Sequence, residues 1–217
     1  MESSFWHKCW ERNTLGFHQS DVHPLLTQYL PKLILPSDTH VFVPLCGKTL
    51  DMVYLAQFMQ VTGNEISAIA CKDFFIDNDI RYKRQTLGDF EYFSCQQLSL
   101  WQGDFFKLSA DIIGSVDLIY DRAALIALPP EMQQSYANHL KHFFSAHTRL
   151  ILVTVEFPEQ QLAGPPFSVN RFDVERLFSG FIVECIATNE LKDKYFAQRK
   201  LKVDSLHEKL YIIRCEQ

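Results

Sequence analysis

Residues 40–51, His-Val-Phe-Val-Pro-Leu-Cys-Gly-Lys-Thr-Leu-Asp, constrain the fold of this chain more than any other stretch. The apolar run Val41-Phe42-Val43 predicts a short buried strand, which Pro44 ends because proline cannot donate a hydrogen bond to a neighbouring strand. Gly47 allows a tight turn, and the amphipathic residues 50–58 predict the following helix. A strand, a turn and a helix N-terminus in this order are typical of the nucleotide site of an open α/β sheet.

Two kinds of ligand fit this turn. Gly47-Lys48-Thr49 matches the end of a phosphate-binding loop, and residues 116–121 would serve as its acidic partner strand. That loop also needs a glycine five positions before Gly47, where this chain has Phe42, and without the glycine the backbone cannot wrap a phosphate. The sequence therefore favours a turn that binds a nucleoside cofactor without contacts to phosphate groups. A turn with no ligand stays an open alternative.

Composition narrows the class of protein. A chain of 217 residues suits one α/β domain or two small ones, and a hydrophobic fraction of 47% supports a full core. The 18 Phe residues predict a core or a pocket rich in flat apolar surface. A net charge of −5 and a pI of about 5.9 argue against nucleic-acid binding. No apolar run approaches the ~20 residues that span a membrane, and residues 1–10 show no secretory signal.

Cysteine and histidine usage points away from disulfides and metals. Six cysteines are dispersed along the chain without a Cys-x-x-Cys pair, which predicts reduced thiols, most of them in the core, of a cytoplasmic protein. His139, His142 and His147 cluster in the sequence, but one helix cannot align all three and no carboxylate is fixed nearby. We interpret them as surface residues and expect no metal site.

The remaining pattern predicts an alternation of strands and helices around a parallel sheet. Asp21 and Ser67 are expected to cap helices over residues 22–33 and 68–77. A polar and aromatic stretch beginning at residue 81 predicts a hairpin. Further helices are expected over residues 131–144 and 172–178, and strands over residues 41–43, 60–66, 98–102, 116–120, 150–156, 181–187 and 209–214.

The N-terminal segment is dense in aromatic residues. Trp6 and Trp10 lie four positions apart, so they share one face of a helix, and Phe17 and His18 follow Gly16 in a loop. A helix that packs its Trp side chains on the sheet is one interpretation. A lid that closes over a flat ligand is the other.

Two acidic positions follow predicted strands. Glu65 lies near the end of the second strand, roughly 20 residues after the first turn, where a carboxylate accepts hydrogen bonds from ribose hydroxyls. A solvated acid is the alternative. Asp104 and Phe105 follow the third strand, where the carboxylate can face the exocyclic amine of an adenine and the ring can pack on the base. Alternatively, Asp104 is a turn residue, and Phe105 and Phe106 belong to the core.

Six ordered blocks of the sequence resemble the thiopurine S-methyltransferases in their bacterial form. They span nearly the whole chain, and the Pro-Leu-Cys-Gly-Lys and Asp-Arg-Ala-Ala-Leu blocks are the most specific. The blocks are Trp6-x-x-x-Trp10, Gly16-Phe17-His18, Val43-Pro44-Leu45-Cys46-Gly47-Lys48 with Asp51-Met52, Gly63-x-Glu65-Ile66-Ser67, residues 120–132 and residues 164–169. The chain departs from the family pattern at Cys9, Asn64 and Ala68.

The resemblance implies an α/β, Rossmann-like methyltransferase fold: a mostly parallel sheet of seven strands, the last one antiparallel, with helices on both faces. It implies S-adenosylmethionine as the cofactor and no metal. Residues 1–217 would form a single methyltransferase domain, in which residues 1–33 are an N-terminal lid and helical segment. Phe17 falls where family members contact the substrate. The residues assigned to the cofactor are Trp6, Trp10, Leu45, Glu65, Asp104, Phe105 and Arg122.

The residue chemistry agrees with this assignment. Methyl transfer from a sulfonium is an in-line displacement, which needs alignment and a dry pocket more than an acid or a metal. The indole of Trp10 can lie against the sulfonium cation. Arg122 can pair with the carboxylate of the cofactor, unless it forms a structural salt bridge with Asp121. The nucleophile belongs to the substrate, so we assign no catalytic side chain.

Three hypotheses for function follow. The first is an S-methyltransferase that acts on aromatic or heterocyclic thiols such as thiopurines, with selenium and tellurium compounds as further substrates linked to bacterial relatives. The second is a P-loop-like protein that binds ATP with magnesium, and the third is a scaffold that binds neither cofactor. We expect the first, in a cytoplasmic monomer that contacts a small-molecule thiol but neither nucleic acid nor a membrane.

Overall fold

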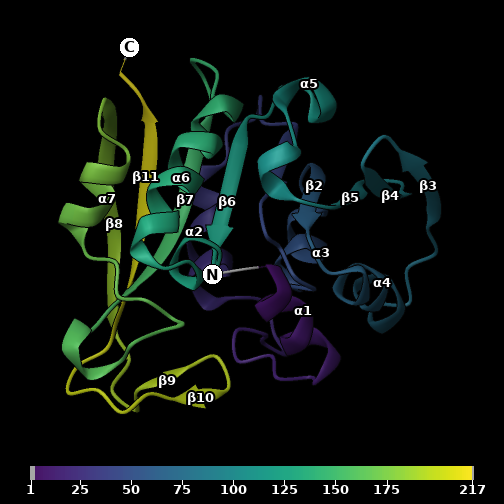
Figure 1. Ribbon diagram of the computed structural model, residues 1–217. Coiled ribbons are helices and arrows are strands. Elements are labelled where there is room, and N and C mark those ends of the chain that lie inside the picture. Colours follow the sequence, from purple (N-terminus) through teal and green to yellow (C-terminus); the bar gives the residue numbers. More distant parts are fainter. Residues whose placement is uncertain (1–2, 217) are drawn as a thin grey trace. The chain divides into compact units, whose positions relative to one another are not determined.

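The computed structural model describes residues 3–216, which divide into two compact units, residues 3–116 and residues 117–216. We call them the N-terminal and the C-terminal unit and describe each by itself (Figure 1). Each unit combines helices with strands that pair partly in parallel and partly antiparallel. None of the described helices is long and apolar enough to cross a membrane.

The N-terminal unit contains five strands in the order β3-β4-β5-β2-β1. The strands β1 (His40–Val43) and β5 (Leu98–Gln102) pair in parallel with β2 (Gln60–Glu65), while β3 (Lys83–Leu87) and β4 (Phe90–Cys95) form an antiparallel hairpin beside β5. The helices are α1 (Ser3–Glu11), α2 (Pro24–Leu33), α3 (Asp51–Leu55), α4 (Ala68–Asp77), α5 (Ala110–Ile113) and the 3-10 turn η1 (Phe105–Lys107).

The C-terminal unit contains four strands in the order β6-β7-β11-β8. The strand β6 (Leu118–Arg122) pairs in parallel with β7 (Arg149–Glu156), and β11 (His207–Cys215) lies antiparallel between β7 and β8 (Phe181–Glu190). The short strands β9 (Tyr195–Phe196) and β10 (Arg199–Lys200) form a separate hairpin. The helices are α6 (Pro130–Leu140), α7 (Arg171–Leu177) and the 3-10 turns η2 (Leu125–Ala127), η3 (Lys141–Phe143) and η4 (Glu159–Gln161).

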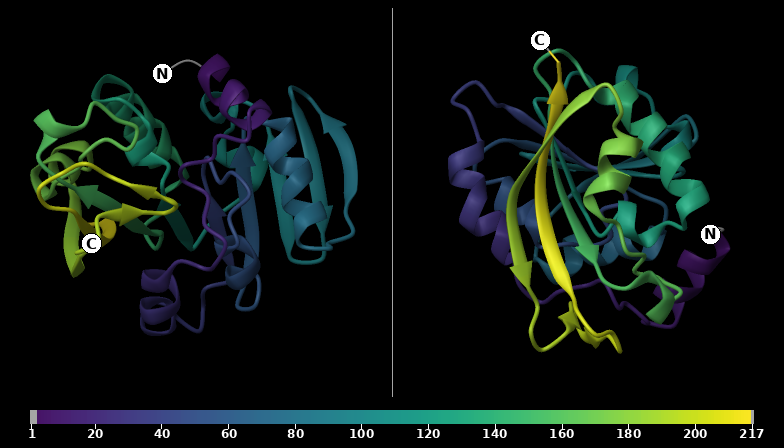
Figure 2. Two further views of the ribbon diagram at one scale, coloured as in Figure 1. Left: turned by 90° about the horizontal axis from the view of Figure 1, so that it is seen from below. Right: turned by 90° about the vertical axis from the view of Figure 1, so that its left-hand side faces the viewer.

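Burial explains why the sequences of β1 and β7 contain continuous apolar runs. Val41, Phe42 and Val43 of β1 are all buried, as are residues 150–155 of β7, because helices or loops cover both faces of a parallel sheet. In the C-terminal unit, α6 and α7 lie next to each other on one side of β7, β11 and β8 (Figure 2). The sheet ends that matter for ligands are therefore the carboxyl ends of β1, β2 and β5 in one unit and of β6 and β7 in the other.

Most of the expected elements are confirmed, and β5 matches its expected residues 98–102. Ser67 caps α4 as expected, since its hydroxyl accepts a hydrogen bond from the Ala70 N–H at 3.3 Å. The predicted α/β class is also confirmed. The expected number of seven strands is wrong, because the hairpin β3–β4 adds two antiparallel strands beside β5.

Three local expectations are also wrong. Asp21 does not cap α2: His23 precedes the helix without a side-chain cap, and the Asp21 carboxylate accepts a hydrogen bond from Ser20 instead. The helix predicted over residues 50–58 ends at Leu55, because the next residues tighten into turns before β2 begins at Gln60. All six cysteines are free, but only Cys46 and Cys71 are buried, so most of them are not core residues.

Candidate active site

The turn after β1 has a backbone shape that few residues adopt. Leu45 and Gly47 both have positive φ, 46° and 55°, in the left-handed region. The Cys46 N–H donates to the Asn64 carbonyl at 2.9 Å, and the Gly47 N–H donates to the Glu65 carboxylate (Oε2) at 2.9 Å. The end of β2 therefore holds this turn in place.

Glu65 joins two loops at the carboxyl end of the sheet. Its Oε2 accepts from Gly47, and its Oε1 accepts from the Ser67 N–H at 2.7 Å at the start of α4. The residue is 5% exposed, and burial raises the pKa of its carboxyl while these backbone hydrogen bonds oppose the shift. A carboxylate oxygen can accept two hydrogen bonds, so each oxygen keeps capacity for a donor from a ligand. The sequence pointed to this residue but not to its structural role.

The two residues before Glu65 shape the same sheet end. A Cβ on Gly63 would lie 2.5 Å from the Leu100 side chain, 2.8 Å from Cys46 Sγ and 2.9 Å from Met52 Sδ, so only glycine fits there. The buried Asn64 donates through Nδ2 to the carbonyls of Trp101 at 2.9 Å and Gly103 at 3.3 Å. This amide ties the turn after β5 to β2, a role for which the sequence held no signal beyond a departure from the family pattern.

Asp104 and Phe105 occupy that turn. The Gly103 N–H donates to the Glu65 carbonyl at 2.9 Å, so the turn adjoins the end of β2. Asp104 is exposed, and its carboxylate accepts from the Phe106 N–H at 3.0 Å at the start of η1. Phe105 is 2% exposed and stacks on Phe42 with ring centroids 6.4 Å apart. The ring of Phe105 is thus a core residue in this structure, and contacts of Asp104 and Phe105 with an adenine stay a prediction.

The aromatic N-terminal segment approaches the turn after β1. Trp6 of α1 lies against Phe17, with ring centroids 5.7 Å apart, and both are half-buried. The indole of Trp10 covers Gly47, since its Cζ2 would lie 3.3 Å from a Cβ placed on that glycine. A side chain at position 47 would therefore crowd the indole as well as strain the backbone.

Lys48 is not arranged to bind a phosphate. Its Nζ forms an ion pair with Asp77 at 2.7 Å and lies 3.9 Å from Asp73, both on α4. Phe42, at the position where a phosphate-binding loop has glycine, is fully buried. The turn, the carboxylates and the nearby indole suit a ligand that offers hydroxyls, an amine and a flat ring.

Asp121 and Arg122 end β6 in the C-terminal unit. Asp121 is 1% exposed, accepts from the Tyr136 hydroxyl at 2.7 Å and from the Leu125 N–H at 3.1 Å, and thereby ties β6 to α6 and η2. Burial raises its pKa to about 6. Arg122 is half-buried at the carboxyl end of the strand, and its pairing with a ligand stays a prediction.

We expect the charge on Asp121 to make folding stability depend on pH. Because the folded state raises the pKa from 3.8 to about 6, it holds the proton more tightly than the unfolded chain does. The free energy of unfolding should therefore fall as pH rises from 3.8 to about 6, by about 3 kcal/mol from this group. Urea denaturation across this range should show that the free energy of unfolding of Asp121→Asn rises relative to that of the parent as pH rises.

A second variant tests whether Asp121 is the group whose titration changes the stability. Tyr136→Phe removes a hydroxyl that lowers the Asp121 pKa, so the pH window should move upward. A free-energy difference between Asp121→Asn and the parent that stays constant from pH 4 to 7 would show that Asp121 is not the titrating group.

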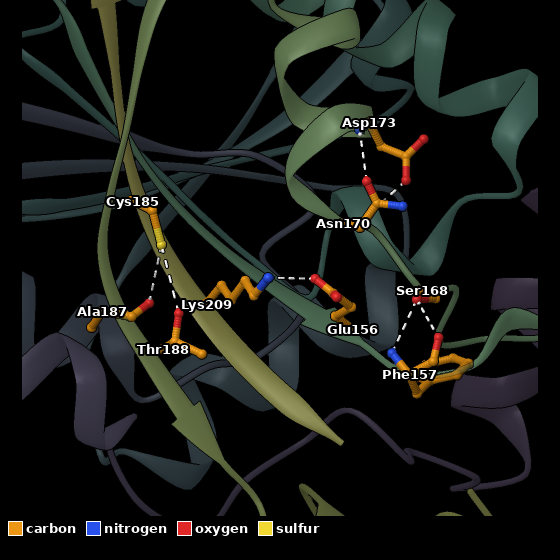
Figure 3. Close-up of polar contacts among 9 residues, drawn as sticks. All are labelled: Glu156, Phe157, Ser168, Asn170, Asp173, Cys185, Ala187, Thr188 and Lys209. Atoms are coloured by element: carbon orange, nitrogen blue, oxygen red, sulfur yellow. Dashed lines mark hydrogen bonds and ion pairs between the residues drawn. The ribbon is translucent and has the colours of Figure 1, made fainter. Parts of the chain in front are cut away.

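Polar contacts also fix the carboxyl end of β7 (Figure 3). Lys209 of β11 forms an ion pair with Glu156 at 2.5 Å. Ser168 accepts from the Phe157 N–H at 3.1 Å and donates to the Phe157 carbonyl at 2.8 Å, which closes the base of the loop over residues 158–167. Asn170 and Asp173 then form a capping box that starts α7.

The structure brings some of the expected site residues together. In the N-terminal unit, Leu45, Glu65 and Trp10 meet around the turn after β1, and Asp104 joins them through the turn that Glu65 and Asn64 hold. Trp6 and Phe17 lie in the neighbouring aromatic segment, and Arg122 belongs to the other unit. The ligand contacts expected of all these residues remain predictions.

Comparison with known sequences gives one consistent result. The model of the family described as "Thiopurine S-methyltransferase (TPMT)" matches residues 1–216. A thiopurine S-methyltransferase of Shewanella baltica is 41% identical over 216 residues, and the match covers 99% of each chain. One from Shewanella oneidensis is 39% identical with the same coverage.

Solved structures with a similar fold include methyltransferases. An S-adenosylmethionine-dependent methyltransferase from Anabaena variabilis has a TM-score of 0.67 at 16% identity, covering 98% of this chain and 94% of that one. Magnesium protoporphyrin IX methyltransferase from Synechocystis, solved with bound S-adenosylhomocysteine, has a TM-score of 0.63 at 15% identity, covering 98% of this chain and all of the other. At such low identity these structures establish the fold alone.

Proposed function

Because the chain belongs to the thiopurine S-methyltransferase family, whose model matches residues 1–216, we propose that the turn after β1 and the ends of β2 and β5 hold S-adenosylmethionine for transfer of its methyl group to a thiol. The chain is an S-adenosylmethionine-dependent S-methyltransferase of aromatic and heterocyclic thiols such as thiopurines. The observation that carries the site is the buried Glu65 carboxylate, which accepts hydrogen bonds from the Ser67 N–H and from the N–H of Gly47, the residue that the Trp10 indole covers.

Each expected residue has a stated role in this proposal. Glu65 accepts hydrogen bonds from the ribose hydroxyls, and Asp104 accepts one from the adenine amine beside Phe105. Leu45 presents its backbone in the turn, and Trp10 lies against the sulfonium. Arg122 pairs with the carboxylate of the amino-acid end. Trp6 and Phe17 belong to a lid formed by the N-terminal segment, with Phe17 toward the substrate.

Methyl transfer requires the protein mainly to align the two reactants and to exclude water from them. When bound, S-adenosylmethionine supplies an activated methyl group whose leaving group is a neutral thioether. It would supply that group to the sulfur of a substrate thiol that has lost its proton to solvent, with S-adenosylhomocysteine as the neutral leaving group and a methyl thioether as the product. No side chain is required as a nucleophile, so the chain's residues bind, orient and cover the reactants.

The proposal also covers the cellular compartment, the oligomeric state and the substrate class. We place the enzyme in a reducing cytoplasm, because all six of its cysteines are free thiols. We also propose that it works as a monomer. Thiopurines and other aromatic thiols are the substrate class, and selenium and tellurium compounds are candidates of related nucleophilicity.

A thermal-shift comparison tests the ligand class. S-adenosylhomocysteine is expected to raise the melting temperature with saturable dependence on its concentration, and ATP with magnesium is expected to leave it unchanged. The physical reason is that Lys48 is already paired with Asp77 and the turn lacks the glycine that wraps a phosphate. Stabilisation by ATP alone would favour the nucleotide-binding alternative, and no response to either ligand would favour a scaffold.

A further inference from the structure

Asn64, near the carboxyl end of β2, is a buried amide whose oxygen has no hydrogen-bond partner. The residue is 0% exposed. Its Nδ2 group donates to the Trp101 carbonyl at 2.9 Å and to the Gly103 carbonyl at 3.3 Å. Its Oδ1 atom is also buried, but it accepts no hydrogen bond from any residue between 3 and 216. A buried acceptor without a donor lowers the free energy of unfolding, so stability alone does not account for an amide at this position.

The hydrogen bonds of Asn64 fix the backbone that leads from β5 into Asp104. The strand β5 lies beside β2, and Trp101 is in register with Asn64 (Figure 1). The Gly103 N–H donates to the Glu65 carbonyl at 2.9 Å, and Asn64 binds the carbonyls of the peptide groups on either side of that N–H. Three successive peptide groups before Asp104 are therefore bonded to β2, two of them through this one side chain.

The residues after Asp104 are fixed by burial. Phe105 is 2% exposed and stacks on Phe42, with ring centroids 6.4 Å apart. Asp104 itself is exposed, and its Oδ1 atom accepts from the Phe106 N–H at 3.0 Å. A carboxylate can accept several hydrogen bonds, so Asp104 keeps capacity for a donor from a ligand. This exposed carboxylate is thus held between two anchors, Asn64 before it and Phe105 after it.

A carboxylate that is held in one place can distinguish two purines by one group. Adenine carries an exocyclic amine, which donates a hydrogen bond to a carboxylate, whereas hypoxanthine carries an oxygen at the same position and repels it. A hydrogen bond weakens steeply when its distance or angle departs from the ideal. The preference for adenine therefore depends on the groups that fix the backbone of Asp104 as well as on the carboxylate.

We propose that Asn64 is a positioning residue for the cofactor, which aims the Asp104 carboxylate at the adenine amine and so sets the preference of the site for adenine over hypoxanthine. This inference rests on the proposed function, because it assigns a further residue to the same cofactor site. Asn64 acts through the backbone of residues 101–104 and not by contact with the cofactor. Glu65, by contrast, is proposed to bind the ribose, which the adenine and hypoxanthine nucleosides share.

The test measures the affinity of the full chain for two ligands by isothermal titration calorimetry. The ligands are S-adenosylhomocysteine and S-inosylhomocysteine, in which an oxygen replaces the exocyclic amine of the adenine. Asn64→Leu keeps the approximate size of the side chain but removes its donors, and Asp104→Ala removes the carboxylate. Asn78→Leu is the matched control, because Nδ2 of Asn78 also donates to a backbone carbonyl, that of Phe74 at 2.7 Å, but at the C-terminal end of α4.

The ratio of the two Kd values reports the aim of the carboxylate. The parent should bind S-adenosylhomocysteine about 100-fold more tightly than S-inosylhomocysteine. Asn64→Leu should lower this ratio to about tenfold, and Asn78→Leu should leave it unchanged. Asp104→Ala should lower the ratio to about threefold, and adding Asn64→Leu to it should lower the ratio no further, because Asn64 acts through Asp104. A purely structural role of Asn64 would weaken the binding of both ligands equally.

Three results would overturn the inference. They are an unchanged ratio in Asn64→Leu, an equal effect of Asn64→Leu with and without the Asp104 carboxylate, and a parent protein that binds both ligands with the same affinity. Urea denaturation reports whether each variant folds. If Asn64→Leu does not fold, Asn64→Ser, which retains one donor, should lower the ratio to about thirtyfold, and an unchanged ratio would count against the inference.

The proposed function fails in a different way from this inference. If the parent protein binds neither ligand and methylates no aromatic thiol, the assignment as an S-adenosylmethionine-dependent S-methyltransferase is wrong, and the role of Asn64 is wrong with it. If the parent binds S-adenosylhomocysteine and methylates a thiol, but Asn64→Leu leaves the ratio of the two Kd values unchanged, only the positioning role is wrong.

Discussion

Replacing Glu65 with alanine is expected to weaken the binding of S-adenosylhomocysteine by about 1–3 kcal/mol, a rise of roughly 5- to 150-fold in Kd. The variant loses a carboxylate that is proposed to bind the ribose hydroxyls. It also leaves the N–H groups of Gly47 and Ser67 without their acceptor, so the two loops that form the site lose their common anchor. Isothermal titration calorimetry measures the change directly.

Two further variants sharpen this experiment. Glu65→Gln keeps one acceptor oxygen but turns an amide NH₂ group toward a backbone N–H, so it should lose most of the affinity as well. Glu91→Ala is the matched control, since its carboxylate also accepts two hydrogen bonds, from Thr86 and Arg84, but lies in the hairpin β3–β4. Unchanged affinity in Glu65→Ala would reject the ribose role and direct attention to a neighbouring acid such as Asp73.

The parts of the fold that could be predicted are those fixed by local pattern. The strand β5 follows from the five residues 98–102 and the polar residues around them, and the cap by Ser67 follows from a hydroxyl directly before a helical segment. The family assignment also followed from sequence, because several ordered motifs each require particular residues. Family membership in turn specified the cofactor and the reaction.

The parts that could not be predicted depend on contacts between distant residues. The position of Glu65 suggested a ligand contact, but its bonds to Gly47 and Ser67 follow only from the way two loops converge. The position of Phe105 after a strand predicts an adenine contact, but the stacking of its ring on Phe42, 63 positions earlier in the chain, could not be predicted from sequence. Asn64 could not be interpreted from sequence, because its partners are carbonyls in another strand and its turn.

The second large effect is expected in the dependence of methyl transfer on pH. The attacking group is the substrate's thiolate, so below the pKa of the thiol the rate of the chemical step should fall about tenfold per pH unit. Two aryl thiols whose pKa values differ by about two units should therefore give profiles displaced by about two units. The reason is that the proposed mechanism uses no side chain as a base, and the thiol loses its proton to solvent.

If the rate profiles of both thiols instead change slope at the same pH, a group on the enzyme controls the loss of the proton. His18 follows Phe17 in the proposed lid, and a free histidine has a pKa of about 6.5. Asp121 has a pKa of about 6 and lies beside Arg122 in the sequence. His18→Gln and Asp121→Asn would then separate these two groups, because only the variant that removes the controlling group would shift the break.

The most direct test of the account is single-turnover methyl transfer from S-adenosylmethionine carrying a trideuterated methyl group to an aromatic thiol, followed by mass spectrometry. The account predicts one product, the aryl methyl thioether with all three deuterium atoms on its sulfur-bound methyl group. It also predicts an equal amount of S-adenosylhomocysteine and no requirement for an added metal ion. Binding of the cofactor without any thioether, or transfer of the label to an atom other than sulfur, would contradict the assignment of this chain as a thiol S-methyltransferase.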